Sequence, residues 1–195
     1  MVRVTRLRAF VNLIRVDPLF VPRLLLHGLH PRTLLLTTTQ ARRIFFSPQY
    51  PSDKLEKFAR YFSESESMVC VLGMIPKFVD FRSVVQRSIV GLGGCKPESE
   101  RILILVGELD VFMDVRTMHR LAKRYREAVR HSIDENGEAR VSSFEGHEAD
   151  REQTYMEDRG DGVRMVVVKG AGHHVQNDLQ WEVGVERVVD FLQQL

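Results

Sequence analysis

Two short apolar runs, each closed by glycine, stand out in the second half of the chain. Residues 102–106 are continuously apolar and end at Gly107, and residues 165–168 are β-branched or apolar and are followed by Gly170 and Gly172. A run of this length that stops at glycine is typical of a strand buried on both faces. The pattern predicts an α/β fold with a short parallel sheet.

Helical periodicity follows each of the two runs. Asp114 and Asp178 are residue types that cap helix N-termini, and we expect each to begin a helix, the second ending at Leu192. The first helix is expected to bury Val115, Met118, Leu121, Tyr125 and Val129. The second is expected to dock on the sheet through Trp181, Val185, Val188, Val189 and Leu192.

Residues 130–162 are strongly polar and acidic, which favours a surface insertion between the two strands. His147, Glu148 and Asp150 are residue types that bind metals, but the segment offers no rigid scaffold for them. A solvated loop is the better interpretation. We predict no metal site and no cofactor.

The first half of the chain is cut into short pieces by proline and predicts a helical lid over residues 1–95. One of its helices is expected near residues 54–62, with Leu55 on its buried side. Further along, Met74, Phe78 and Phe81 form an apolar stripe. Such a stripe is usually packing, and a substrate-binding role for these three residues is a hypothesis.

The candidate chemistry lies directly after the two predicted strands. Asp110 stands three residues beyond Gly107, and His173 follows Gly172. If the strands are parallel neighbours joined by a crossover helix, both side chains reach the same edge of the sheet. A carboxylate there fixes the tautomer of the imidazole, so that its other nitrogen can take a proton from a nucleophile.

The order strand, GxxD loop, helix, strand, GxGH and helix over residues 101–195 resembles the C-terminal part of α/β-hydrolases. The resemblance implies that Asp110 is the catalytic acid, that His173 is the base, and that residues 96–195 are the C-terminal catalytic half of such a domain. It also makes residues 44–48 look like part of a mobile lid. The implied partner is a small-molecule ester or acyl-lipid substrate.

The chain departs from this family in lacking a GxSxG nucleophile elbow. Cys95 after Gly93 and Gly94 is the nearest imitation, with His27-Gly28 as an apparent oxyanion loop, but Pro97 obstructs the helix that an elbow requires. Cys95 is therefore read as a linker cysteine. We expect a partial α/β-hydrolase fold that belongs to a longer hydrolase, or a product that begins inside one, with little activity of its own.

Two alternatives stay open. The chain could be a noncatalytic remnant that binds an acyl ligand or a protein, or it could be a lipid acyltransferase, since His173 and Asp178 have the H-x-x-x-x-D spacing of such enzymes. A sheet with only two recognisable strands also leaves an open edge, through which the chain could form an oligomer.

Composition adds only a little to this picture. With a formal net charge of +2, the chain shows no signal for a nucleic-acid partner, and Cys70 and Cys95 alone imply no disulfide framework. The reducing cytoplasm is therefore the default expectation. The arginine-rich N-terminus is typical of a solvated lid helix, with a mitochondrial transit segment or contact with an anionic membrane surface as alternatives.

Overall fold

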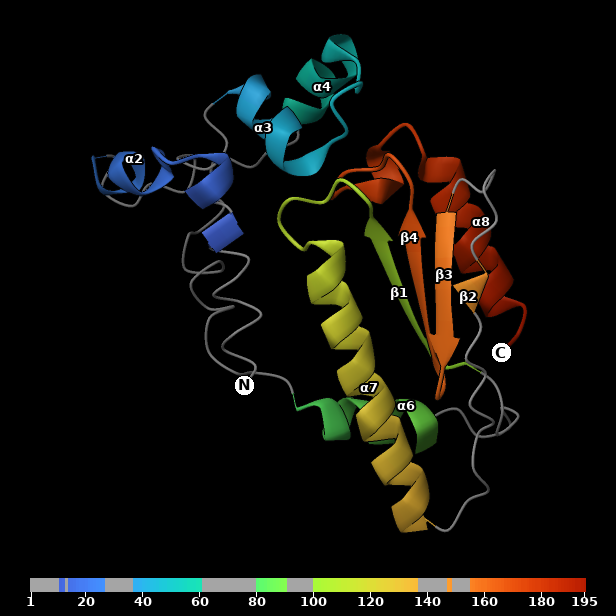
Figure 1. The fold of residues 1–195 in the computed structure, drawn as a ribbon. Coiled ribbons are helices and arrows are strands. Elements are labelled where there is room, and N and C mark those ends of the chain that lie inside the picture. Colours follow the sequence, from blue (N-terminus) through green and yellow to red (C-terminus); the bar gives the residue numbers. More distant parts are fainter. Residues whose placement is uncertain are drawn as a thin grey trace.

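The computed structural model describes residues 11–12, 14–26, 37–60, 80–90, 100–136, 147–148 and 155–195. These residues form a mixed helix and sheet structure with the strand order β1-β4-β3-β2 (Figure 1). The strands are β1 (Ile102–Gly107), β2 (His147–Glu148), β3 (Tyr155–Gly160) and β4 (Val163–Val168). The helices are α2 (Phe20–Leu26), α3 (Thr38–Phe45), α4 (Ser52–Ala59), α6 (Phe81–Val90), α7 (Val115–Asn136), the 3-10 turn η2 (Val175–Asn177) and α8 (Trp181–Leu192).

The two apolar runs form neighbouring parallel strands, as the sequence predicts. Ile102 of β1 pairs with Val163 of β4, and the register continues to Gly107 opposite Val168. The expectation of a parallel sheet holds only for this pair, because β3 runs antiparallel to β4 and β2 antiparallel to β3. The sheet is therefore mixed.

Helices cover both faces of the sheet (Figure 1). One face packs on α7, where Met118 and Val129 meet Ile104, Val106 and other buried strand residues. The opposite face holds Val166 and Val168, against which Val183 of α8 packs. Asp114 caps α7 as expected, since its Oδ1 accepts a hydrogen bond from the Thr117 amide at 2.6 Å.

The predicted insertion over residues 130–162 is wrong at both of its ends. Helix α7 continues to Asn136, and residues 155–160 form β3. A search for apolar runs does not predict this strand, because it carries charged residues. These charges are paired inside the fold. Asp158 accepts hydrogen bonds from Arg126 of α7 at 3.0 and 3.2 Å, and Glu157 lies 3.4 Å from the buried guanidinium of Arg164.

The face of α8 that packs on the sheet also differs from the prediction. Trp181 and Val185 of the predicted inner stripe are 47% and 46% exposed, and the other three members of the stripe are exposed as well. The helix instead turns Val183, Gly184 and Phe191 inward. Gly184 permits this orientation, because a Cβ there would lie only 2.9 Å from the side chain of Val175.

Three helices from the first half of the chain, α2, α3 and α4, lie beyond the carboxyl ends of β1 and β4 (Figure 1). Helix α3 begins with a capping box in which Thr37 and Gln40 satisfy each other's backbone amides. In α4 the side chain of Leu55 is buried, as the periodicity indicates. Helix α6 lies away from this group, against α7 near the amino ends of the strands.

Candidate active site

The chain segments at the carboxyl ends of β1 and β4 are in close backbone contact at Gly107 and Gly172. A Cβ on Gly107 would lie 2.1 Å from the carbonyl oxygen of Gly172, and one on Gly172 would lie 2.6 Å from the backbone of Phe46. Only a residue without a side chain allows such an approach. The amide of Leu109 donates to the carbonyl of Ala171 at 2.8 Å, which fixes the two loops together.

This contact brings Asp110 and His173 together, as the sequence predicts. Nδ1 of His173 lies 2.8 Å from Oδ2 of Asp110. The other carboxylate oxygen, Oδ1, accepts hydrogen bonds from the amides of Phe112 and Met113 at 2.8 and 2.7 Å. The Asp110 side chain is only 4% exposed, so its carboxylate is held by the loop and presents one oxygen to the imidazole.

The imidazole of His173 is partly exposed. Its side chain is 29% exposed, and within the described part of the chain Nε2 has no hydrogen-bond partner. The rings of Phe45 and Phe112 flank the imidazole at centroid distances of 5.8 and 5.6 Å. The partly exposed imidazole therefore lies beside two aromatic rings.

Asp178 is the second buried carboxylate of the region. It does not cap α8, which begins at Trp181 after Gln180, so the predicted N-cap is wrong. Its oxygens instead accept from the Ser47 amide at 2.7 Å, the Ser47 hydroxyl at 2.6 Å, the Gly172 amide at 2.8 Å and its neighbour Leu179 at 2.8 Å. Asp178 therefore ties the α3–α4 connection to the residue that precedes His173.

His174 has a packing role distinct from that of His173. Its amide donates to the Phe45 carbonyl at 2.8 Å, and its ring lies among Phe45, Phe46 and Phe58, with centroids 5.0, 5.8 and 5.5 Å away. Burial lowers the pKa of this imidazole below its ordinary value of 6.5, and the nearby His173 adds to the effect. Burial therefore favours the neutral form of His174, which helps dock α3 and α4 on the histidine loop.

Of the predicted substrate-binding stripe, the structure describes only Phe81, which does not lie at this site. Phe81 lies in α6, with its ring edge-to-face on Tyr125 of α7 at 4.9 Å. Met74, Phe78, Cys95 and His27-Gly28 lie outside the described residues. In the part of the chain that is described, no group of three His, Cys, Asp or Glu side chains could hold a metal ion.

The sequence pattern does not predict a role in the site for two of its residues, Ser47 and Phe112. Ser47 was assigned only to the lid and Phe112 to no role, yet Ser47 is fully buried on Asp178 and Phe112 contacts the imidazole. Phe112 could have been inferred, because it lies in the loop that carries Asp110. No sequence signal links Ser47 to Asp178, since 131 positions separate them.

No family model, curated protein or solved structure matches this chain. The site is therefore interpreted from its own geometry.

Proposed function

We propose that this chain supplies the acid and the base of an α/β-hydrolase-type enzyme that cleaves an ester or lipid-like substrate. The observation that carries the proposal is the 2.8 Å contact between His173 and Asp110, formed above the carboxyl ends of adjacent parallel strands. Active sites of open α/β sheets lie at this edge. In this proposal the fold is a partial α/β-hydrolase domain with α2, α3 and α4 as its lid.

The chemistry follows from the two ends of the imidazole. Asp110 accepts a hydrogen bond from Nδ1–H, so Nε2 of neutral His173 carries a lone pair and can take the proton of a nucleophilic hydroxyl as that oxygen attacks the ester carbonyl. The imidazolium then gives this proton to the leaving alkoxide, which leaves the acyl group on the nucleophile. A water that gives a proton to the same nitrogen would then attack this acyl group and release the acid, while the proton returns to the nucleophile. The Asp110 carboxylate stays ionised throughout and stabilises the charged ring.

The nucleophile is the part that this chain does not provide. Its sequence contains no GxSxG elbow, and the hydroxyl of Ser47 is buried and donates to Asp178. Acid and base act through the nucleophile as one unit, so they accomplish little without it.

Acyl transfer through the H-x-x-x-x-D spacing is less well supported. In the described structure the ring of His173 is oriented by Asp110, whereas Asp178 is occupied by four backbone and hydroxyl donors. A noncatalytic binding role has one observation in its favour, the exposed apolar stripe of α8 that includes Trp181 and Val185.

The purified 195-residue chain is expected to hydrolyse p-nitrophenyl butyrate no faster than its His173→Ala variant does, and not to react with a fluorophosphonate probe. Both would be measured at neutral pH, by absorbance and by intact-protein mass. Turnover well above that of His173→Ala, or a probe adduct that the variant does not form, would mean that a nucleophile lies within this chain.

A further inference from the structure

Helix α2 has one buried side and one exposed apolar side. Phe20 is 1% exposed and packs with Ile44, Phe45 and Phe112, two of which flank the imidazole of His173. In contrast, Leu19, Leu25 and Leu26 are 64%, 67% and 82% exposed. These three exposed leucines lie in or next to one short helix close to His173. Such a cluster indicates contact with an apolar environment outside the chain.

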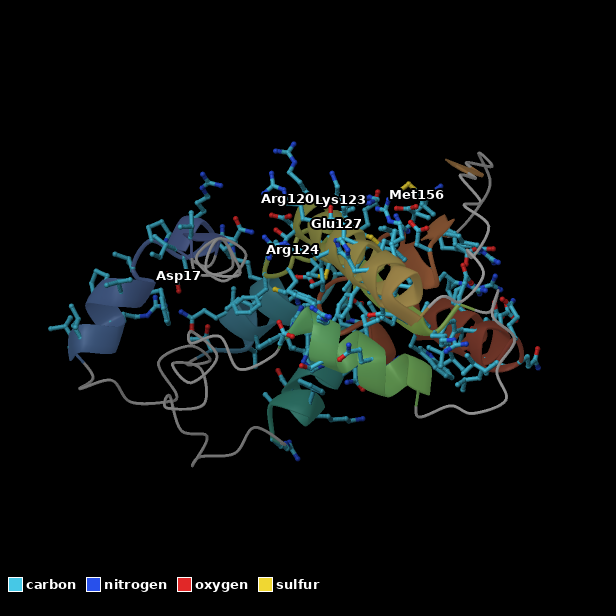
Figure 2. All side chains as sticks on the ribbon, turned by 90° about the horizontal axis from the view of Figure 1, so that it is seen from below. Asp17, Arg120, Lys123, Arg124, Glu127 and Met156 are labelled. Atoms are coloured by element: carbon cyan, nitrogen blue, oxygen red, sulfur yellow. The ribbon has the colours of Figure 1, made fainter. Side chains whose placement is uncertain are left out.

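The charge around α2 indicates what that environment is. The first 60 residues contain eleven Arg and Lys and only three Asp and Glu, whereas the remainder contains seventeen and twenty-three. In the described part of this segment Arg15, Arg43, Lys54, Lys57 and Arg60 are exposed, against the exposed carboxylates of Asp53 and Glu56. Asp17 lies beside α2 (Figure 2) and is neutralised by an ion pair with Arg23.

Exposed leucines within a strongly basic segment match the interface of an anionic bilayer, where apolar side chains enter the acyl boundary and cations meet the lipid phosphates. We propose that α2, together with the basic surface of α3 and α4, docks the chain on an anionic lipid membrane. No helix in the described ranges is long and apolar enough to cross a membrane.

This docking places His173 next to its proposed substrate class. The inner side of α2 packs on the two phenylalanines that flank the imidazole, so α2 and these two rings would separate a bilayer on the outer side from His173. The assignment of a lipid ester as substrate rests on the proposed function, whereas the docking itself does not.

Co-sedimentation of the 195-residue chain with vesicles tests the docking without any turnover. We expect binding to vesicles that contain phosphatidylglycerol, weaker binding at high salt, and little binding to pure phosphatidylcholine vesicles. Leu25→Ser combined with Leu26→Ser should weaken binding by about tenfold or more, because two leucine side chains that would enter the bilayer are lost. The control is Val185→Ser with Val189→Ser on α8, which should bind like the unmodified chain.

The charge contribution has its own matched pair of variants. Arg43→Glu with Lys57→Glu should weaken binding by about tenfold or more. Arg120→Glu with Lys123→Glu changes the net charge equally on the outer side of α7 (Figure 2) and should stay within about twofold of the unmodified chain. Circular dichroism would verify that each variant is folded.

Three results would overturn the proposal. The first is equal binding to neutral and anionic vesicles, or to neither. The second is equal loss of binding in a variant and its matched control. The third is a change in oligomeric state by light scattering, without vesicles, when Leu25 and Leu26 are replaced, since the leucines would then cover a second copy of the chain. Loss of vesicle binding with an intact Asp110–His173 pair would leave the proposed function standing.

Discussion

In a longer protein that contains both this chain and a GxSxG nucleophile, replacing His173 with Ala is expected to lower kcat/KM by about 10⁵-fold or more. In the proposed function the imidazole takes the proton from the nucleophile, and its Nδ1 lies 2.8 Å from Oδ2 of Asp110. Asp110→Asn should cost less, about 10⁴-fold, because the ring remains but its tautomer is no longer fixed. Steady-state kinetics with a chromogenic ester would measure both losses.

His119→Ala is the control for this series. His119 is 47% exposed on α7, where it lies 3.4 Å from Asp158 of β3. Its replacement should leave kcat/KM nearly unchanged. If His173→Ala retained activity similar to that of His119→Ala, the assignment of His173 as the base would be wrong.

Asp178→Ala is expected to have the largest effect on folding, a loss of about 3–5 kcal/mol in the free energy of unfolding. The carboxylate is 2% exposed and accepts four hydrogen bonds. Its removal leaves the amides of Ser47 and Gly172 and the Ser47 hydroxyl buried without an acceptor. Urea denaturation followed by circular dichroism would measure the loss.

Two further variants calibrate this measurement. Ser47→Ala removes one donor together with its hydrogen bond and should cost only about 1–2 kcal/mol. Asp190→Ala breaks a surface ion pair with Arg187 and should cost about 1 kcal/mol or less. An Asp178→Ala variant as stable as Asp190→Ala would contradict the role assigned to this carboxylate.

The strands and the Asp110–His173 pair could be predicted because their signals are local. An apolar run of strand length that ends in glycine can be recognised without knowing which strand it pairs with. Strands β1 and β4 lie where those runs are. Once both strands are placed in one parallel sheet, the positions of Asp110 and His173 after the two glycines bring them to the same edge.

The orientation of α8 could not be chosen from periodicity alone. The helix has two apolar sides. One runs through Trp181 and Val185, and the other, which faces the sheet, runs through Val183 and Phe191. The larger stripe is the exposed one. Gly184 was the available signal, because a glycine in a helix interior is costly unless close packing requires it.

Charged partners that are remote in sequence explain the other differences. Strand β3 carries Glu157 and Asp158, whose partners Arg164 and Arg126 lie on another strand and on α7, so its polar composition looked like a loop. Asp178 has a residue type and position suited to a helix cap, and its actual partner Ser47 lies in the connection between α3 and α4. Such pairings arise only from the tertiary structure.

The tautomer of His173, read from the ¹⁵N shifts of its ring in the 195-residue chain, tests the central claim most directly. The contact with Asp110 predicts that the neutral ring carries its proton on Nδ1, and that Asp110→Ala populates the Nε2-protonated form as well. A ring protonated on Nε2 in the unmodified chain, with no response to Asp110→Ala, would contradict the assignment of an acid and base pair.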